Sequence, residues 1–452
     1  MCYNNSVCRK GVEKMNIFGT KGKEHIDGHK GLTTSSPIIE IEKEKVEKVY
    51  LPLLSPNGKE VTLCVAEGDD VLVGTKYGVR TDFYVPQYSP VSGKVLGKEK
   101  RYSAIVGRPI DHLVIENDFN YTEAENVLKI VSLDDSKEVI FEAIKEAGLV
   151  GLGGAGFPTY VKYNNPQNIE AIIVNAVECE PYLTTDFFAT QQEPEMLCKA
   201  VQFLIKVSGA SKAIIAYKQH KGVEKEPIEA ALEQVVGNYP NVELRRVPDV
   251  YPMGWERLLV KTVTGREYNA LPSEAGVIVN NVQTVIALGH ALLEGKPLTK
   301  KLVTVSGDGI ASPCNIWCPI GTPAKTLIDA CGGYTAEDVN VVPGGPMCGR
   351  AVLKDEFPIN AQMGAICVFK YKPIKAEPCL RCGACSDHCP MGLQPVELQI
   401  ALKQKDTERM AKLKGHLCMS CGMCSYICPS KIDVTGNMNK MKLQLKIANM
   451  KK

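Results

Sequence analysis

The sequence predicts a multidomain α/β protein, with an all-β module near its N-terminus and a cysteine-rich helical segment at its C-terminus. Short strand-like runs separated by turns fill residues 45–118, and strands alternate with helices over residues 135–298. A run of four cysteines occurs twice after residue 368. A chain of 452 residues has room for these parts, because most domains hold about 100 to 200 residues.

The charge and the apolar content of the sequence argue against nucleic acid as a partner and against a membrane span. The net charge is +2, and no basic stripe is interleaved with aromatic residues, so nucleic acid is not an expected partner. No apolar run approaches the roughly 20 residues that span a bilayer, and the stretch MCYNNSVCRKGVEKMN lacks the apolar core of a secretion signal. We therefore expect a cytoplasmic protein, whose reducing surroundings favour metal ligation by its 18 cysteines over disulfides.

The N-terminal part divides into an extension and a β-module. Residues 1–44 are polar and are expected to be irregular. Residues 45–118 contain two hairpin-like halves, GDDVLVGT and SPVSGKVLG, which are similar to the barrel-sandwich fold of lipoyl and biotinyl carriers. The attachment lysine of a carrier would be Lys94, but its setting SGKV does not match the carriers' motif. A structural β-module is therefore favoured over a covalent carrier.

The middle of the chain is expected to hold a parallel sheet and then a smaller unit. A helix is predicted at 135–147, and the strands IEAIIVNAV, KAIIAYK and VELRRVP then alternate with helices. The helix VQTVIALGHALLEG closes this domain near residue 298. Residues 299–352 are expected to form a small α+β unit. In the last segment, 368–452, one helix, QPVELQIALKQKDTERMAKLKG, is expected between the cysteine runs.

The two cysteine runs, CLRCGACSDHCPMG and CMSCGMCSYICPS, share the spacing CxxCxxCxxxCP. In two-cluster ferredoxins the first three cysteines of such a run bind one [4Fe–4S] cluster, and the fourth binds the other. The spacing therefore predicts one cluster on Cys379, Cys382, Cys385 and Cys428, and a second on Cys418, Cys421, Cys424 and Cys389. Zinc is the weaker alternative, because duplicated zinc ribbons lack this triple step. Two such clusters imply one-electron transfer.

A glycine-rich loop lies in GLVGLGGAGFPTYVK, residues 148–162, where Gly151, Gly153 and Gly156 fit GxGxxG. The match to a Rossmann turn is weak, because a helix rather than a strand precedes the loop. Glycines still permit close approach of the backbone to a ligand, and a following helix N-terminus can accept a phosphate. Lys162 is a candidate cation for the same ligand. The alternative is a plain glycine-rich connector.

Three stretches in order, GLGGAGFPT, VNAVECEPYLTTD and GVIVNNVQT, resemble the flavin subunit of respiratory complex I and its relatives. With the β-module in front and the doubled cysteine run at the end, the chain resembles the RnfC family of the Rnf electron-transport complex. The resemblance implies four domains: a barrel-sandwich β-module, an α/β flavin/NADH domain, a β-grasp (SLBB-like) domain, and a helical ferredoxin-like domain with two [4Fe–4S] clusters.

The resemblance also implies the cofactors and their site. FMN is expected to bind without a covalent bond, NADH to donate a hydride, and the clusters to carry electrons away. Glu178 and Glu180 are expected near the flavin ring or the nicotinamide ribose. Hydrogen bonds to the flavin or its phosphate are expected from Asn175, Asn281 and Thr284. The full set of implied cofactor-binding residues is Gly151, Gly153, Gly154, Gly156, Lys162, Asn175, Glu178, Glu180, Asp186, Asn280, Asn281 and Thr284. No side chain is expected to act as a catalytic acid or base.

Two classes of function stay open. The first is an NADH-dependent oxidoreductase that passes electrons to other electron-transfer subunits or to ferredoxin, docked peripherally on a membrane complex at the cytoplasmic face of the inner membrane. In a soluble variant of this class, the acceptor is a substrate reductase such as proline reductase. The second class is a non-catalytic iron–sulfur relay that has lost flavin or NADH binding. Intact GLGGAGFPT and ECEP favour the first class.

Further cysteines depart from the usual family sequence. Cys314 and Cys318 lie in SPCNIWCPIGTP, and Cys348 lies in GGPMCG. Cys314 and Cys318 are interpreted either as incidental core cysteines or as a redox-active pair that exchanges electrons with a partner.

Overall fold

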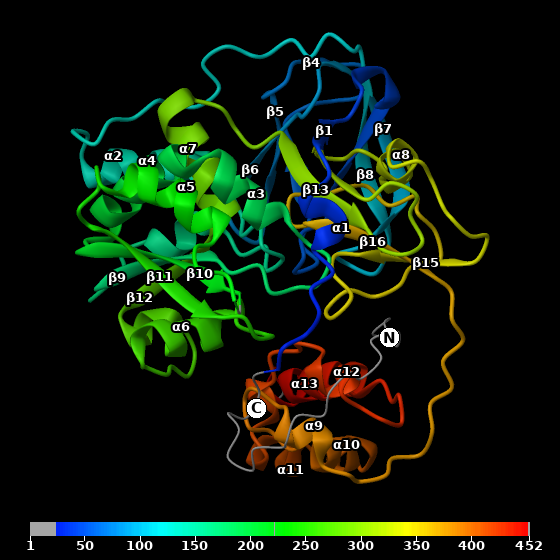
Figure 1. Ribbon diagram of the computed structural model, residues 1–452. Coiled ribbons are helices and arrows are strands. Elements are labelled where there is room, and N and C mark those ends of the chain that lie inside the picture. The colour runs from blue at the N-terminus through cyan, green and yellow to red at the C-terminus, as the bar shows by residue number, and fades with distance from the viewer. Residues whose placement is uncertain (1–23, 221, 451–452) are drawn as a thin grey trace.

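The computed structural model describes residues 24–220 and 222–450, without the side chains of 449 and 450. Four domains are visible in Figure 1. We call them the β-module (48–117), the parallel-sheet domain (137–294), the mixed-sheet domain (300–370, with strand β1) and the cysteine domain (379–450). The cysteine domain lies below the other three in the view of Figure 1.

The β-module consists of two antiparallel sheets, with strand orders β2-β8-β7-β4 and β3-β5-β6. Its strands are β2 Lys48–Pro52, β3 Val61–Leu63, β4 Asp70–Val71, β5 Lys76–Arg80, β6 Val85–Tyr88, β7 Gly93–Ser103 and β8 Arg108–Asn117. Val49 and Leu51 of β2 are buried in the same core as Ile316 of the mixed-sheet domain, so the module packs against its neighbour. Lys94 is exposed on β7, opposite Glu116 of β8.

The parallel-sheet domain has the strand order β11-β10-β9-β12, with every pairing parallel, as the alternation of strands and helices predicts. Its strands are β9 Ala171–Ala176, β10 Lys212–Gln219, β11 Val242–Pro248 and β12 Val277–Asn281. Its helices are α2 Lys137–Glu146, η2 Thr159–Tyr163, α3 Thr185–Gln192, α4 Pro194–Ser208, α5 Pro227–Val236, α6 Glu256–Thr264, η3 Pro272–Ala275 and α7 Val282–Glu294. β9 and the middle of β10 are apolar runs because α4 and α7 cover one face of the sheet and α6 covers the other (Figure 1).

The topology of this sheet brings the predicted site residues together. Asn281 at the end of β12 pairs in register with Asn175 near the end of β9. The carboxyl ends of parallel strands lie at one edge of a sheet, which is where open α/β domains place their ligands. The loop after β9 and the N-terminus of α7 therefore face the same space.

The mixed-sheet domain has the strand order β1-β14-β13-β16-β15. Its strands are β1 Ile38–Glu40, β13 Lys300–Ser306, β14 Cys314–Pro319, β15 Val339–Pro343 and β16 Ala365–Lys370, and its helix is α8 Ala324–Ala330. The chain before the β-module also forms α1 Gly31–Thr34 and η1 Lys43–Lys45.

One expectation about the mixed-sheet domain was wrong, and another was incomplete. The described part of 1–44 is not simply irregular, because β1 pairs in parallel with β14 at the edge of the sheet; residues 1–23 lie outside the described residues. The sheet of the unit predicted at 299–352 also takes in a later strand, because β16 lies between β13 and β15. β1 has only three residues, and its partner β14 lies far away in the sequence, so no local pattern marked it.

The cysteine domain is helical around a small apolar core. Its elements are α9 Ala384–Asp387, α10 Pro395–Lys403, α11 Thr407–Lys412, η4 Gly415–Leu417, α12 Met423–Tyr426 and α13 Val434–Met450. The single helix expected between the cysteine runs is two helices, because Lys405 takes a φ of 57° and Asp406 caps α11 by accepting a hydrogen bond from the Arg409 amide. Within 24–220 and 222–450, no helix is both long enough and apolar enough to cross a membrane.

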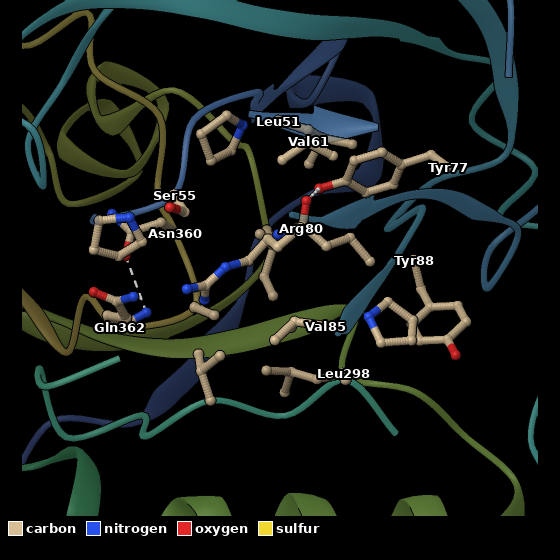
Figure 2. Close-up of a pocket in the computed structure, with 18 of the residues that line it drawn as sticks. Leu51, Ser55, Val61, Tyr77, Arg80, Val85, Tyr88, Leu298, Asn360 and Gln362 are labelled. Atoms are coloured by element: carbon tan, nitrogen blue, oxygen red, sulfur yellow. Dashed lines mark hydrogen bonds between the residues drawn. The ribbon is translucent and has the colours of Figure 1, made fainter. Parts of the chain in front are cut away.

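A cavity of about 100 Å³ lies where the first three domains meet (Figure 2). Its walls include Val61 and Tyr88 of the β-module and Gln362 of the segment that leads into β16. Gln362 also lies against the glycine-rich loop, since a Cβ atom on Gly156 would stand 2.0 Å from its Nε2 atom. The mixed-sheet domain therefore covers one side of that loop.

Candidate functional site

The glycine loop, residues 151–157, turns back on itself between α2 and η2. The Gly151 amide donates to the Phe157 carbonyl at 2.9 Å, and the Gly156 amide donates to the Gly151 carbonyl at 3.1 Å. Gly156 takes a φ of 61°, a conformation that other residues seldom adopt. These bonds fix the two ends of the loop and leave its middle facing outward.

The middle of the glycine loop presents a row of amides. Gly153, Gly154 and Ala155 are exposed, and in the part of the chain that the structure describes their amides have no protein acceptor. Gly154 takes a φ of 102°, and a Cβ atom there would meet no atom within 4 Å. Successive free amides in such a turn form a concave anion site. The loop therefore fits the phosphate of a cofactor such as FMN.

The N-terminus of α7 forms the floor beneath this loop. Asn281 caps the helix, because its Oδ1 atom accepts from the amides of Gln283 (3.0 Å) and Thr284 (3.3 Å). The Thr284 hydroxyl in turn accepts from the Leu152 amide at 3.0 Å. A Cβ atom on Gly153 would lie 3.1 Å from the Asn281 Nδ2 atom. Glycine at 153 thus permits close approach of the loop to the helix.

Asp186 joins this floor to the loop that follows β9. Its carboxylate accepts from the Asn281 Nδ2 atom at 3.0 Å and from the Gln283 Nε2 atom at 2.6 Å. Glu178 lies beside it, since its carboxylate accepts from the amides of Asp186 (3.2 Å) and Phe187 (3.3 Å) at the start of α3. Burial raises the pKa of Glu178. The structure therefore brings together two carboxylates and the capped helix below the glycine loop.

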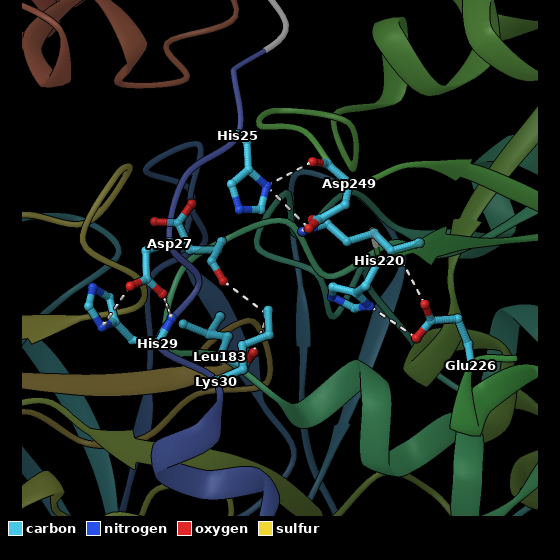
Figure 3. Close-up of polar contacts among 10 residues, drawn as sticks. His25, Asp27, His29, Lys30, Leu183, His220, Glu226 and Asp249 are labelled. Carbon is cyan, nitrogen blue, oxygen red and sulfur yellow. Dashed lines mark hydrogen bonds and ion pairs between the residues drawn. The ribbon is translucent and has the colours of Figure 1, made fainter. Parts of the chain in front are cut away.

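Two lysines, one buried and one half-buried, complete the group, and neither was predicted from the sequence. Lys301 of β13 is 1% exposed and donates to the Gln283 Oε1 atom at 2.9 Å. Burial lowers its pKa to about 8, although Asp186 and Glu178 act in the opposite direction. Lys30, before α1, donates to the Leu183 carbonyl (Figure 3), and burial lowers its pKa as well. Each reaches the parallel-sheet domain from another part of the fold, so no motif could identify it.

Three other predicted residues donate hydrogen bonds to protein groups around the site. Asn175 donates to the Gly254 carbonyl at 2.7 Å, and Lys162 donates to the Val279 carbonyl at 2.6 Å. Lys162 is half-buried, and the loss of solvation lowers its pKa. Asn280 donates to the Tyr163 hydroxyl. Direct contacts of these three side chains with a flavin stay predictions.

Glu180 lies away from this group, at the contact with the cysteine domain. Its carboxylate accepts from the amides of Met347 (2.7 Å) and Cys348 (3.1 Å), and burial raises its pKa. The Tyr251 hydroxyl lies 3.4 Å from this carboxylate and donates to the Cys421 carbonyl at 2.5 Å. We call Glu180, Tyr251, Met347, Cys348 and Cys421 the junction.

The thiols of the cysteine domain form two sets, and each set contains three cysteines of one run and the fourth cysteine of the other. A hollow of about 20 Å³ is lined by Cys379, Cys382, Cys385 and Cys428, which we call the first set. The second set is Cys389, Cys418, Cys421 and Cys424. Burial raises the pKa of Cys424, and the nearby thiols of the other three cysteines raise it further. The fourth cysteine of each run thus lies with the other run, as the spacing predicts.

The two runs share one local conformation. Gly383 and Gly422 take φ values of 80° and 83°. The Arg381 amide donates to the Cys379 sulfur, and the Ser420 amide donates to the Cys418 sulfur, each at 3.4 Å. Hydrogen bonds of this kind stabilise cysteine thiolates, and hydrogen bonds to sulfur also tune iron–sulfur clusters. Between 24 and 450, outside residue 221, no three His, Cys, Asp or Glu side chains are grouped as a single-ion site.

The two sets differ in their surroundings. Cys379 and Cys382 of the first set are exposed. Cys421 of the second set is 8% exposed and lies at the junction. A Cβ atom on the adjacent Gly422 would stand 2.2 Å from the Met347 carbonyl oxygen, so the second run packs tightly against the mixed-sheet domain.

Of the two interpretations of Cys314 and Cys318, the structure favours core cysteines, because both are buried in one hydrophobic core and do not meet. Four residues along a strand span about 13 Å, too far for two thiols to meet. The Cys318 sulfur lies 3.7 Å from the Lys301 carbonyl, whereas the Cys314 sulfur lies 3.3 Å from the sulfur of Cys331. Cys331 follows α8, and no sequence pattern points to it, because its proximity depends on how α8 packs on the sheet.

Four family models match the chain in the order that the domains follow. They are the RnfC barrel sandwich hybrid domain (19–120), the Nuo51 FMN-binding domain (144–290), the SLBB domain (302–351) and the 4Fe-4S dicluster domain (375–432). The predicted fold class is therefore confirmed, and the matches include an FMN-binding domain and a domain for iron–sulfur clusters.

Relatives match over most of the chain. The C subunit of the Na(+)-translocating ferredoxin:NAD(+) oxidoreductase complex of Acetobacterium woodii is 35% identical over 364 residues, covering 78% of this chain and 81% of the relative. The C subunit of the proton-translocating ferredoxin:NAD(+) oxidoreductase complex of Clostridium ljungdahlii is 34% identical, covering 87% and 86%. A solved NAD+-reducing [NiFe]-hydrogenase in the air-oxidized state matches with a TM-score of 0.49 and 22% identity, over 69% of this chain and 63% of that chain. By its identity to the two curated relatives and its coverage of them, this chain belongs to the RnfC family of Rnf-complex subunits.

Proposed function

We propose that this protein oxidises NADH and passes the electrons, by way of FMN and two [4Fe–4S] clusters, to other subunits of an Rnf-type complex. FMN, when bound, accepts a hydride as an electron pair and releases electrons one at a time. The observation that carries the proposal is the bond from Tyr251 to the Cys421 carbonyl, at 2.5 Å. It joins the domain with the glycine loop to the second set of thiols.

The chain's own residues supply the flavin site. The amides of Gly153, Gly154 and Ala155 are the donors we assign to the phosphate. Asn281 and Thr284 hold the loop above the N-terminus of α7, whose dipole also favours an anion. Gln362 covers the opposite side of the loop.

The two thiol sets supply the iron–sulfur sites. We assign one cluster to each set, with amides donating to Cys379 and Cys418. The second set is the one at the junction, so we place it nearer the flavin site. The exposed Cys379 and Cys382 place the first set at the surface, where a protein acceptor can approach. Cys389 belongs to one run and Cys428 to the other, so the sets fold as one unit.

The decisive experiment is anaerobic. The protein is reconstituted with iron, sulfide and FMN, NADH is added without a partner, and the absorbance of flavin and clusters is followed together. Bleaching of both is the expected result. If dithionite reduces the clusters while NADH changes neither chromophore, the protein is an iron–sulfur relay and the proposal of NADH oxidation fails.

Replacing Lys301 by methionine is expected to weaken FMN binding about tenfold without loss of clusters. The change leaves the buried Gln283 Oε1 atom without its donor, and an unpaired buried polar group costs about 1–3 kcal/mol. Isothermal titration of the apoprotein with FMN measures the effect. Lys300→Met is the matched control, because the neighbouring Lys300 is half exposed and pairs with Glu40. Equal losses in the two variants would contradict the positioning role of Lys301.

We further propose that the protein works in the cytoplasm, docked peripherally on a membrane complex through other electron-transfer subunits. A reducing compartment suits thiols that ligate metal. An acceptor that docks over the first set should protect Cys379 and Cys382 from a small alkylating reagent in the cluster-free protein. Equal alkylation with and without the candidate acceptor would exclude docking at that surface.

A further inference from the structure

The mixed-sheet domain holds a pair of thiols that the proposed electron path does not use. Cys314 begins β14, and Cys331 follows the last residue of α8. Their sulfur atoms lie 3.3 Å apart, against about 2.05 Å in a disulfide. Both side chains belong to the same hydrophobic core. The two sulfurs therefore need to approach each other by only about 1 Å to form a disulfide bond.

The backbone around the pair is held in place on both sides. The Ser312 amide donates to the Cys331 carbonyl at 2.9 Å, and the Ala311 amide donates to the Gly333 carbonyl at 3.1 Å. These two bonds keep the start of β14 beside the end of α8. The thiols thus meet because of a fixed backbone contact, and not only because two core side chains happen to touch.

The two thiols are not equivalent. Cys314 is 7% exposed and Cys331 is 1% exposed. The hydrogen bond from Cys331 lowers the pKa of Cys314, and the same bond raises the pKa of Cys331. Cys314 is therefore both the more accessible sulfur and the better nucleophile, because the thiolate is the reactive form.

We propose that Cys314 and Cys331 form a reversible dithiol–disulfide site that reacts with small disulfides. The Cys314 thiolate attacks one sulfur of the oxidant and releases one thiol, leaving a mixed disulfide. The Cys331 sulfur, as its thiolate, then attacks the Cys314 sulfur and releases the second thiol. The protein loses two protons and two electrons, and the small disulfide becomes two thiols. The new bond ties β14 to α8 and does not depend on NADH or FMN.

The site can be tested by mapping disulfides in the anaerobic holoprotein. The protein is treated with 2-hydroxyethyl disulfide, free thiols are alkylated, and the digest is analysed by mass spectrometry. We expect the peptide with Cys314 to be linked to the peptide with Cys331, and dithiothreitol to separate them. The oxidised protein should also show a higher midpoint for thermal unfolding than the reduced protein, since the bond constrains the unfolded chain.

Two variants make the test specific. Cys318→Ser should form the link as the natural chain does, because Cys318 contacts the Lys301 carbonyl and not the pair. Cys331→Ser should stop at the mixed disulfide on Cys314. The proposal is overturned if both cysteines remain fully alkylated after treatment, if the link forms only after the protein is unfolded, or if Cys314 links to Cys318.

Discussion

The double variant Cys385→Ser/Cys428→Ser should lose one iron–sulfur cluster and keep the other. These cysteines come from different runs, but both line the hollow of the first set. Removing both leaves Cys389, Cys418, Cys421 and Cys424 complete. Iron and sulfide contents after anaerobic reconstitution should therefore fall to about half of the natural protein's values, since four of the eight ligands serve each cluster.

The matched control takes both cysteines from one run. Cys385→Ser/Cys389→Ser damages the first set through Cys385 and the second through Cys389, so it should lose both clusters and nearly all iron. If each run bound its own cluster instead, the outcomes would reverse: this control would keep one cluster, and Cys385→Ser/Cys428→Ser would lose both.

Gly422→Ala should slow the reduction of the clusters by NADH about tenfold or more. Its Cβ atom would stand 2.2 Å from the Met347 carbonyl oxygen, and Gly422 also takes a φ of 83°. A backbone oxygen cannot move aside as a side chain can, so the second run must shift away from the junction. A strain of about 1–3 kcal/mol is enough to reduce the docked population tenfold. Stopped-flow absorbance after mixing with NADH measures the rate.

Gly383→Ala separates the effect of docking from that of backbone strain. Gly383 occupies the same position in the other run, with a φ of 80°, but its Cβ atom would meet nothing nearer than 3.9 Å. The two variants therefore carry the same conformational cost, and only Gly422→Ala meets the junction. Reduction by dithionite should be unaffected in both. Equal slowing of NADH-driven reduction in the two variants would show that backbone strain, and not the contact at the junction, lowers the rate.

The sequence by itself determined the features that depend on local spacing. The apolar runs of β9 and β10 and the helices between them fixed the parallel sheet, because periodicity over a single element reports which faces are buried. The cysteine spacing predicted which thiols would lie together, since a run of this kind already encodes the turn that presents three sulfurs to one centre. The glycine loop was also recognisable as a candidate phosphate site, and the structure adds the row of amides that Gly153 and Gly154 expose.

Only the tertiary structure decided the features that depend on contacts between distant segments. Lys301 lies below the glycine loop because β13 packs against the parallel-sheet domain, and Gln362 covers the loop from the segment before β16. Glu180 stands two residues from Glu178, yet it binds the amides of Met347 and Cys348 at the junction. Cys314 meets Cys331, and not Cys318, because α8 returns to the sheet beside β14. The residues in such contacts are separated by 17 to more than 160 positions in the sequence. No local periodicity can therefore predict that they meet.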